Sequence, residues 1–332
     1  MFNEEYLFTT GVIRSREAKL LSSVDIERIV DAKTAEEALK VFNDTDYADE
    51  LPDIEKPEDF NQGLLHDQKQ ARDLMEKIIP DRTLIKFLFL RYDYHNIKLL
   101  FKAKFSGQEL DKNASDLGNI SYDILKTYIL KEEDKGVLPE IKGSIDRARE
   151  AFEKDQTPFF IDLFLDKEYY RLLRELTEKL KCEFVDGLVS DQIDMVNVDA
   201  FLRVREMARP LEFLERVLVE GGAIPQSIFL EYFEKSEEEF FRHLPRYLGD
   251  RKLQQELEES IKARESYRRG KIFEEYEVRY LGRAKFIAYG PEIVVAYYLA
   301  KNNAIRNIRL IMIGKVNGIP ANEIRQRVRE IY

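Results

Sequence analysis

The sequence has 332 residues, of which 44% are hydrophobic, and a formal net charge of −10. This content supports one large core or a few smaller cores of the usual ~100–150 residues, and it excludes a chain that is disordered throughout. The negative charge argues against binding to nucleic acid or to anionic lipid, because both require clustered positive charge.

Glycine (15) and proline (10) are scarce, and Leu, Glu, Lys, Arg and Ala recur at helical spacing, so we expect an all-α protein. The single cysteine, Cys182, excludes an intramolecular disulfide and a Cys/His zinc cluster, and we expect it to be inert. A reducing cytoplasm fits this composition best.

The sequence lacks the usual features of a membrane-inserted chain. Residues 1–11 contain Glu4 and Glu5 and lack a basic stretch followed by an apolar one, so no signal peptide is expected. The most apolar run, 293–300, is far shorter than the ~18–20 residues that cross a bilayer. We therefore expect no direct membrane insertion. An acidic body would instead suit a partner with basic cytoplasmic loops.

In chain order, the first predicted helix starts lie at residues 23–26 and 34–37. The sequence Ser-Val-Asp-Ile at 23–26 is similar to Ser-Tyr-Asp-Ile at 121–124. Residues 34–37 and 236–239 both have the Ser/Thr-x-x-Glu pattern of a capping box.

Further along, one pattern occurs three times. Each copy has an asparagine followed by apolar residues at i, i+3 and i+4, which predicts an apolar stripe one helix face wide. The copies are 94–101 with Asn96, 195–202 with Asn197, and 305–312 with Asn307, and the asparagines lie 101 and 110 residues apart.

Each repeated helix is expected to stop at glycine, and a new helix is expected to begin shortly afterwards. The predicted stops are Gly107, Gly221-Gly222 and Gly318, and the predicted starts are 120–121, 224–225 and 319–320. The new helices also align with one another, because each has an i, i+4 apolar pair: Leu125 and Ile129, Phe229 and Phe233, and Ile324 and Val328.

These repeats predict three helical domains, 1–107, 108–220 and 221–332. The extra helix at 319–332 would pack back towards the N-terminal unit, where a fourth unit would begin. Similar units with such an overhang indicate pseudo-threefold-related domains around a central cavity. A helical solenoid would show similar periodicity, but usually with units of ~34–47 residues.

The common catalytic motifs are missing. The only Gly-Lys pairs, 270–271 and 314–315, lack the upstream glycine and the following Ser/Thr of a P-loop, and there is no GxGxxG, HExxH or GxSxG. We predict no catalytic, cofactor-binding or metal-binding residues, and no nucleotide hydrolysis by this chain.

The remaining polar candidates have structural interpretations beside functional ones. His66 and His243 are expected to be solvated, and His95 is expected to make a structural hydrogen bond rather than to act in catalysis. The repeated asparagines are interpreted as helix-to-helix hydrogen-bonding positions rather than ligands. The basic cluster 264–271 is interpreted as a solvated helix face, with a contact patch for an acidic partner as the alternative.

Residues 91–100 (RYDYHNIKLL), 290–292 (GPE) and 300–309 (AKNNAIRNIR) resemble the family of C subunits of V/A-type ATPases, whose eukaryotic vacuolar counterparts are the d subunits. Segments 14–21 and 44–47 also look like this family, and the resemblance covers nearly the whole chain. The family typically has Glu where this chain has Asn302-Asn303, a conservative departure.

The resemblance implies a funnel of three similar helical domains. It implies a non-catalytic protein of the central stalk, present as one copy in a hetero-oligomeric complex, that couples the rotor shaft to the membrane rotor ring on the cytoplasmic face. The complex would link ATP synthesis or hydrolysis to proton or sodium transport. Two alternatives stay open: a cytosolic helical scaffold for protein–protein interaction, and an enzyme with a carboxylate-lined site.

Overall fold

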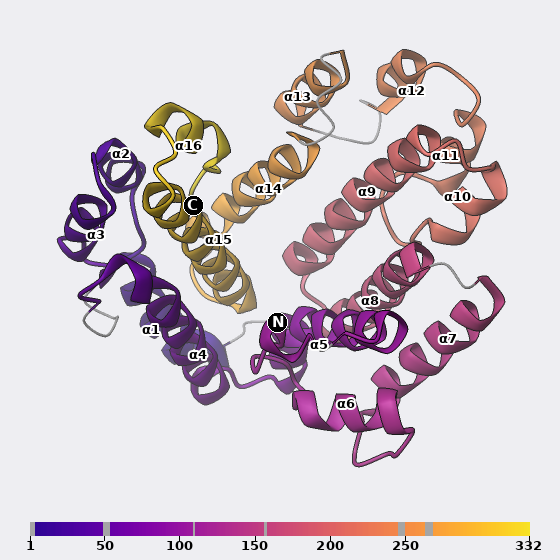
Figure 1. Ribbon diagram of the computed structural model, residues 1–332, viewed down its shortest axis with the longest axis horizontal. Coiled ribbons are helices and arrows are strands. Elements are labelled where there is room, and N and C mark those ends of the chain that lie inside the picture. The colour runs from indigo at the N-terminus through magenta and orange to yellow at the C-terminus, as the bar shows by residue number, and fades with distance from the viewer. Residues whose placement is uncertain (1–3, 49–53, 109, 156–157, 245–249, 263–267) are drawn as a thin grey trace. The chain divides into compact units, whose positions relative to one another are not determined.

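The computed structural model describes residues 4–48, 54–108, 110–155, 158–244, 250–262 and 268–332. Within these ranges every regular element is a helix (Figure 1), so the prediction of an all-α protein is confirmed. The chain divides into two compact units, one made of Met1–Pro80 with Gln255–Tyr332 and the other of Asp81–Gln254. The division into domains 1–107, 108–220 and 221–332 stays a prediction.

The first unit combines both ends of the sequence. Its short 3₁₀ helices are η1 (Glu4–Tyr6), η3 (Pro57–Asp59) and η6 (Gly282–Phe286). Its α-helices are α1 (Leu7–Glu17), α2 (Ser23–Asp31), α3 (Ala35–Asn43), α4 (Phe60–Ile78), α14 (Arg268–Leu281), α15 (Pro291–Val316) and α16 (Ala321–Arg327). Helix α13 (Arg251–Lys262) begins in the second unit and continues into this one.

Helix α15 is the centre of the first unit, and α1, α2, α3, α4, α14 and α16 all pack against it (Figure 1). Ile308 and Ile311 of α15 share one apolar cluster with Ile29 of α2, Phe42 of α3 and Leu64 of α4, and all five side chains are fully buried. Because the N-terminal helices cover a C-terminal helix, neither end of this sequence forms its core alone.

The second unit is built around three long helices, of which the middle one in sequence packs against the other two. Its elements are α5 (Arg82–Ser106), η4 (Asp111–Asn113), α6 (Tyr122–Lys131), α7 (Pro139–Asp155), α8 (Pro158–Leu180), α9 (Glu183–Glu206), α10 (Leu211–Val217), α11 (Gln226–Glu231) and α12 (Glu237–His243). The most extensive packing is between α5 and α8, and α9 packs on α8 and α10. Phe201 of α9 stacks on Phe240 of α12 with ring centroids 4.2 Å apart, and Phe229 of α11 lies 6.1 Å from Phe201.

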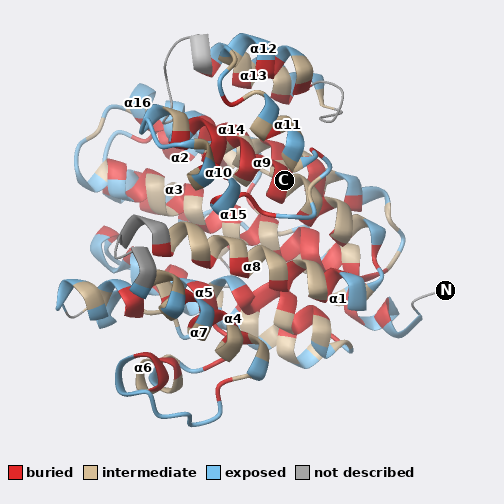
Figure 2. Ribbon diagram, turned by 90° about the vertical axis from the view of Figure 1, so that its right-hand side faces the viewer, coloured by how far each residue is buried: buried red, intermediate tan, exposed pale blue. Residues whose placement is uncertain are grey.

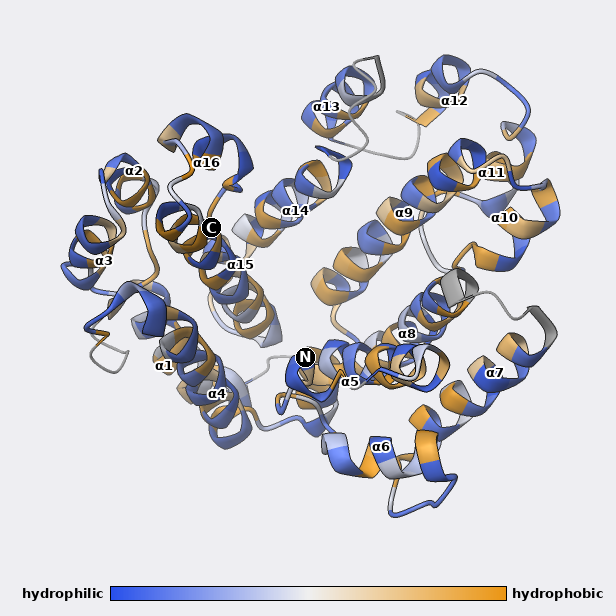
Figure 3. Ribbon diagram, in the orientation of Figure 1, coloured by the Kyte–Doolittle hydropathy of each residue, from blue (hydrophilic) through white to orange (hydrophobic). Residues whose placement is uncertain are grey.

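The long helices are buried on more than one face. In α5 the three consecutive residues Leu99, Leu100 and Phe101 are all buried, and in α15 every residue from 293 to 298 is buried. A helix with apolar residues around most of its circumference lies in the interior of its unit. The predicted stripe was therefore too narrow, because these helices are covered from several sides. Figure 2 shows buried positions throughout them, and Figure 3 shows how apolar and polar residues alternate along the shorter helices.

Glycine ends two of the three repeated helices as predicted. Gly107 follows α5 at φ 68°, and Gly318 follows α15 at φ 67°, the left-handed conformation typical of residues just past a helix. The third stop was wrong, since α9 ends at Glu206 and the left-handed residue after it is Ala208. Gly221-Gly222 lie beyond the intervening helix α10.

The predicted helix starts are confirmed at Ser121, Pro225 and Pro320, which are the N-caps of α6, α11 and α16. A full capping box occurs at Ser236 with Glu239. At the other predicted capping box, Thr34 accepts from Glu37 N–H, but the Glu37 carboxylate accepts from Lys33 N–H instead of from Thr34. A further capping box is formed by Ser22 and Asp25. It was missed because the helix start was predicted at residue 23, one residue after the true N-cap.

Candidate functional site

The repeated asparagines bind backbone rather than another helix. The side-chain amide of Asn96 donates to Ser115 O at 2.8 Å, and its oxygen accepts from Ser115 N–H at 2.9 Å. Asn197 makes the same pair of bonds with Val219 at 2.9 and 2.8 Å, and Asn307 makes it with Arg329 at 3.0 and 3.0 Å. We call each pair an asparagine clip. The predicted helix-to-helix role is thereby corrected.

An asparagine suits this position because its amide carries both a donor and an acceptor. The three asparagines are fully buried or nearly so. A buried extended segment leaves its N–H and C=O without helical partners, and one amide side chain can satisfy both. The clips therefore hold a non-helical segment against the middle of each long helix.

Two of the clips have a second anchor three residues earlier. Asp93 accepts from Ile120 N–H at 2.9 Å and from the Asn119 amide at 2.8 Å. Asp194 accepts from the N–H groups of Ala223 and Ile224, both at 3.0 Å. These bonds fix the chain just before α6 and α11. The spacing Asp-x-x-Asn at 93–96 and 194–197 was a signal for this anchor that the sequence analysis missed.

The third clip lacks this aspartate, since Ala304 occupies the corresponding position. Asn303 partly replaces it by donating to Glu330 O at 2.7 Å. The order of helix and clipped residue also differs. Helix α6 follows Ser115, and α11 follows Val219, whereas α16 precedes Arg329 in the way that α10 precedes Val219. The predicted equivalence of the helix at 319–332 with the other two new helices was therefore wrong.

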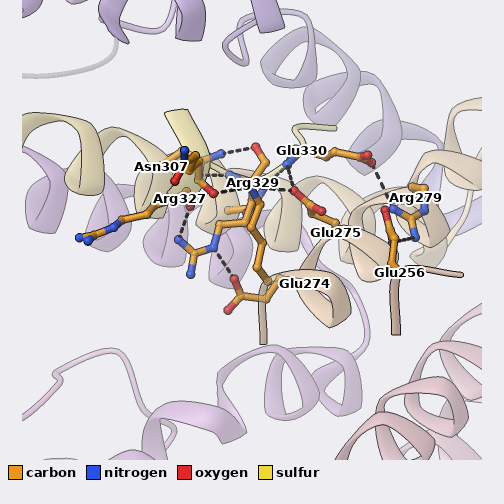
Figure 4. A network of polar contacts seen from close by, with 11 residues as sticks. Glu256, Glu274, Glu275, Arg279, Asn307, Arg327, Arg329 and Glu330 are labelled. Carbon is orange, nitrogen blue, oxygen red and sulfur yellow. Dashed lines mark hydrogen bonds and ion pairs between the residues drawn. The ribbon is translucent and has the colours of Figure 1, made fainter. Parts of the chain in front are cut away.

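Residues 328–332, which we call the tail segment, lie between α14 and α15 (Figure 4). Arg329 Nε donates to Glu274 Oε2 at 2.6 Å, and Glu330 N–H donates to Glu275 Oε1 at 3.3 Å. Arg279 lies 3.5 Å from the Glu330 carboxylate and 3.2 Å from that of Glu256. The segment is thus held by a network of charged groups on α14.

Charged groups also join the chain's two terminal regions within the first unit. Lys315, near the end of α15, donates to Val30 O at 2.6 Å and to Ala32 O, where α2 ends. A cation at these carbonyls satisfies groups that a helix end leaves open. Arg325 of α16 contacts Glu27 and Asp31 of α2.

Two buried carboxylates stand out. Burial raises the pKa of Asp194 to about 6, although the N–H groups of Ile224 and Ala223 lower it. Asp67 is 2% exposed and lies 2.8 Å from the ammonium of Lys301, itself 5% exposed. Tyr47 OH donates to the second oxygen of Asp67 at 2.6 Å. Both carboxylates are occupied by structural partners.

The histidines do not converge. His66 is exposed and contacts Gln70, as expected of a solvated side chain. His95 makes the expected structural hydrogen bond, to Asn113 O at 2.9 Å. His243 is half-buried and lies 5.1 Å from the Tyr232 ring, so the expectation of a simply solvated side chain was wrong.

The predicted basic cluster lies partly outside the described residues, which omit 263–267. Arg269 is buried, and Lys271 donates to Gln326 O at 2.7 Å. Arg268 is exposed, so the described part of the cluster is partly a solvated face and partly engaged within the protein. Cys182 is a buried free thiol.

Among the described residues, no group of His, Cys, Asp or Glu is arranged to hold a metal ion. None of the described helices has both the length and the apolar run needed to cross a bilayer. What the described residues do provide is a set of repeated backbone clips inside helical units. The described residues thus form an all-helical fold in which a long helix with an asparagine clip occurs three times.

The chain matches the model of the ATP synthase (C/AC39) subunit family over residues 9–327, and it belongs to this family. It is 24% identical to the C subunit of the V-type sodium ATPase of Enterococcus hirae over 333 residues, covering 99% of each chain. It is also 24% identical to the C subunit of the A-type ATP synthase of Methanocaldococcus jannaschii, covering 96% of this chain and 85% of the relative. The resemblance to C subunits is confirmed.

Proposed function

We propose that this chain is a non-catalytic component of the central stalk of a V/A-type rotary ATPase, which couples the rotor shaft to the membrane ring. The observation that carries the proposal is the family match over residues 9–327, together with relatives named as C subunits of a V-type sodium ATPase and of A-type ATP synthases. One copy would sit on the cytoplasmic face of the membrane, with three helical domains arranged as a funnel.

The side-chain chemistry supports a mechanical role. A coupling must transmit torque without deforming, and close-packed helical interiors have low compressibility. The clips on α5, α9 and α15 add stiffness because each fixes a non-helical segment to a long helix through paired hydrogen bonds. Irregular segments would otherwise be the most compliant parts of each unit.

The proposal is tested by capture from detergent-solubilised membranes of the source cells. The tagged full-length chain should retain proteins of the membrane ring and of the shaft, identified by mass spectrometry. We expect retention to fall as ionic strength rises, because acidic surface charge would meet basic loops and salt screens exposed pairs. Retention that is unchanged between low and high salt would contradict that electrostatic part.

Recovery of cytosolic partners without ATPase proteins would instead support the alternative of a helical scaffold. The isolated chain should also be assayed for nucleotide hydrolysis. Turnover above that of a buffer control would reject the non-catalytic assignment.

A further inference from the structure

The three asparagine clips differ in how firmly their segments are held. The segment held by Asn197 is interior, with Leu218 0% and Val219 2% exposed, and Asp194 anchors it again further along. In the tail segment, residues 328–332 are all half-buried, and Ala304 stands where an anchoring aspartate would be. The segment held by Asn307 is thus less deeply buried than the one held by Asn197.

The tail segment is held by apolar and by polar contacts. Val328 and Ile331 pack against the apolar cluster of the first unit, and polar groups of α14 and α15 bind Arg329 and Glu330. Its backbone is recognised by Asn307, Asn303 and Glu275, through one N–H and one C=O of Arg329 and the same groups of Glu330. Its side chains are recognised by charge, with Glu274 at Arg329 and Arg279 at Glu330 (Figure 4). The carboxylate of Glu274 is about one third exposed, at 32%, so water and salt can compete for this pair.

This combination is that of a peptide-binding site. Side-chain amides that pair with both backbone groups of a residue recognise an extended chain of any sequence, and flanking charges select particular side chains. The recognised ligand is an extended segment with a basic residue followed directly by an acidic one. We propose that the surface formed by Glu274, Glu275, Arg279, Asn303 and Asn307, called here the α14–α15 site, binds such peptides in exchange for the chain's own tail segment. The proposal is independent of the adaptor role.

An exchangeable site gives opposite responses when its two sides are weakened. Arg329→Ala weakens the built-in occupant but leaves the α14–α15 site intact, so an added peptide should bind more tightly. Asn307→Ala removes backbone recognition of the built-in occupant and of the added peptide alike. Its effect is therefore read in the Arg329→Ala background, where the added peptide should bind more weakly. A tail segment with a purely structural role would give no specific binding of an added peptide in either variant.

The experiment uses the full-length chain and a fluorescein-labelled peptide of sequence Arg-Val-Arg-Glu-Ile-Tyr, which corresponds to residues 327–332. Anisotropy titrations give its Kd. We expect Arg329→Ala to lower the Kd at least about fivefold, because a tethered competitor acts at high effective concentration. Asn307→Ala introduced into the Arg329→Ala chain should raise the Kd at least about tenfold relative to Arg329→Ala alone, the effect of losing paired hydrogen bonds to a buried amide.

Asn317→Ala is the matched control, because Asn317 follows α15 and its amide bonds only within that helix turn, to Ile313 O. It should leave the Kd unchanged. No saturable binding to a folded Arg329→Ala chain, or a Kd that does not rise when Asn307→Ala is added to that chain, would overturn the proposal. A peptide with the same composition in scrambled order that binds equally well would also overturn it.

A second measurement needs no variant. Amide hydrogen exchange in the unaltered chain should be at least about tenfold faster at Arg329 and Glu330 than at Val219, because a segment that exchanges with solvent ligands opens more often. Equal protection at these amides would contradict exchange of the tail segment.

Discussion

Asn197 and Val219 are joined by two hydrogen bonds of 2.9 and 2.8 Å, and the two residues are 1% and 2% exposed. Asn197→Ala would leave the N–H and C=O of Val219 buried without these partners. We expect it to lower the free energy of unfolding by about 3 kcal/mol, since each unsatisfied buried group costs roughly 1–3 kcal/mol. Urea unfolding followed by circular dichroism measures this change.

The control for this prediction is Asn317→Ala, at an exposed asparagine just past α15. It should change the free energy of unfolding by less than about 0.5 kcal/mol, as is usual for surface substitutions. If both variants lost the same free energy of unfolding, the hydrogen bonds between Asn197 and Val219 would not stabilise the fold more than a surface side chain does.

The long helices and their asparagines could be predicted from the sequence, because apolar spacing and the position of Asn96, Asn197 and Asn307 are local features. The binding partners of these asparagines could not be predicted. They lie 19 to 22 residues further along, in irregular segments whose course depends on packing, not on local preference.

The extent of the core shared by the two ends of the sequence could not be predicted either. The sequence predicts only that the helix at 319–332 packs back towards the N-terminal unit, whereas Ile29 and Phe42 share a core with Ile308 of α15. Nothing in a hydrophobic stripe specifies which distant segment covers it, since burial by any apolar surface is similarly favourable. The misplaced glycine stop at Gly221-Gly222 has a comparable cause, because Gly222 serves a contact with Asp194.

Gly222 lies against that carboxylate. A Cβ added there would be 2.1 Å from Asp194 Oδ1, far inside contact distance. Gly222→Ala should therefore displace the carboxylate from the N–H groups of Ala223 and Ile224 and cost at least about 2 kcal/mol of stability, measured by thermal or urea unfolding. Gly11→Ala is the control, since nothing lies within 4 Å of a Cβ there.

Gly11 is inside helix α1, so alanine should leave stability unchanged or raise it by up to about 1 kcal/mol. If Gly222→Ala proved as stable as the unaltered chain, the Asp194 carboxylate would be able to move away from the new methyl group without losing its hydrogen bonds.

Asp194 also predicts a dependence of stability on pH. Burial is the main cause that raises its pKa to about 6, and Asp191 adds to the increase. The unfolded-state pKa of aspartate is about 3.9. Between these two values the folded state binds more protons than the unfolded state, so this group's contribution to the free energy of unfolding decreases as pH rises from about 4 to about 6, and is constant above that.

The measurement compares the unaltered chain with Asp194→Asn, which cannot ionise, by urea unfolding at several pH values. Relative to this variant, the unaltered chain should lose about 2–3 kcal/mol between pH 4 and pH 7, because each pKa unit corresponds to about 1.4 kcal/mol. A difference that stays constant, or that grows in favour of the unaltered chain as pH rises, contradicts this prediction.

Lys301 and Asp67 form a buried ion pair that joins α15 to α4. The ammonium lies 2.8 Å from the carboxylate and 4.7 Å from the centroid of the Tyr47 ring, and Tyr47 OH donates to the same carboxylate at 2.6 Å. Lys301→Met would leave the Asp67 charge buried without its cation. Such a loss typically costs about 3–5 kcal/mol, because desolvation is no longer compensated by attraction.

Replacing both partners, as in Lys301→Met with Asp67→Leu, removes the uncompensated charge and should cost less than the sum of the two single substitutions by at least about 2 kcal/mol. Urea unfolding of the four chains in this double-mutant cycle gives the coupling directly. Tyr47→Phe should add a smaller loss of about 1–2 kcal/mol, because the carboxylate then lacks one hydrogen bond to a charged group. Strictly additive losses would mean that the two charges are each compensated by other groups, and that this pair does not fix the packing of α15 on α4.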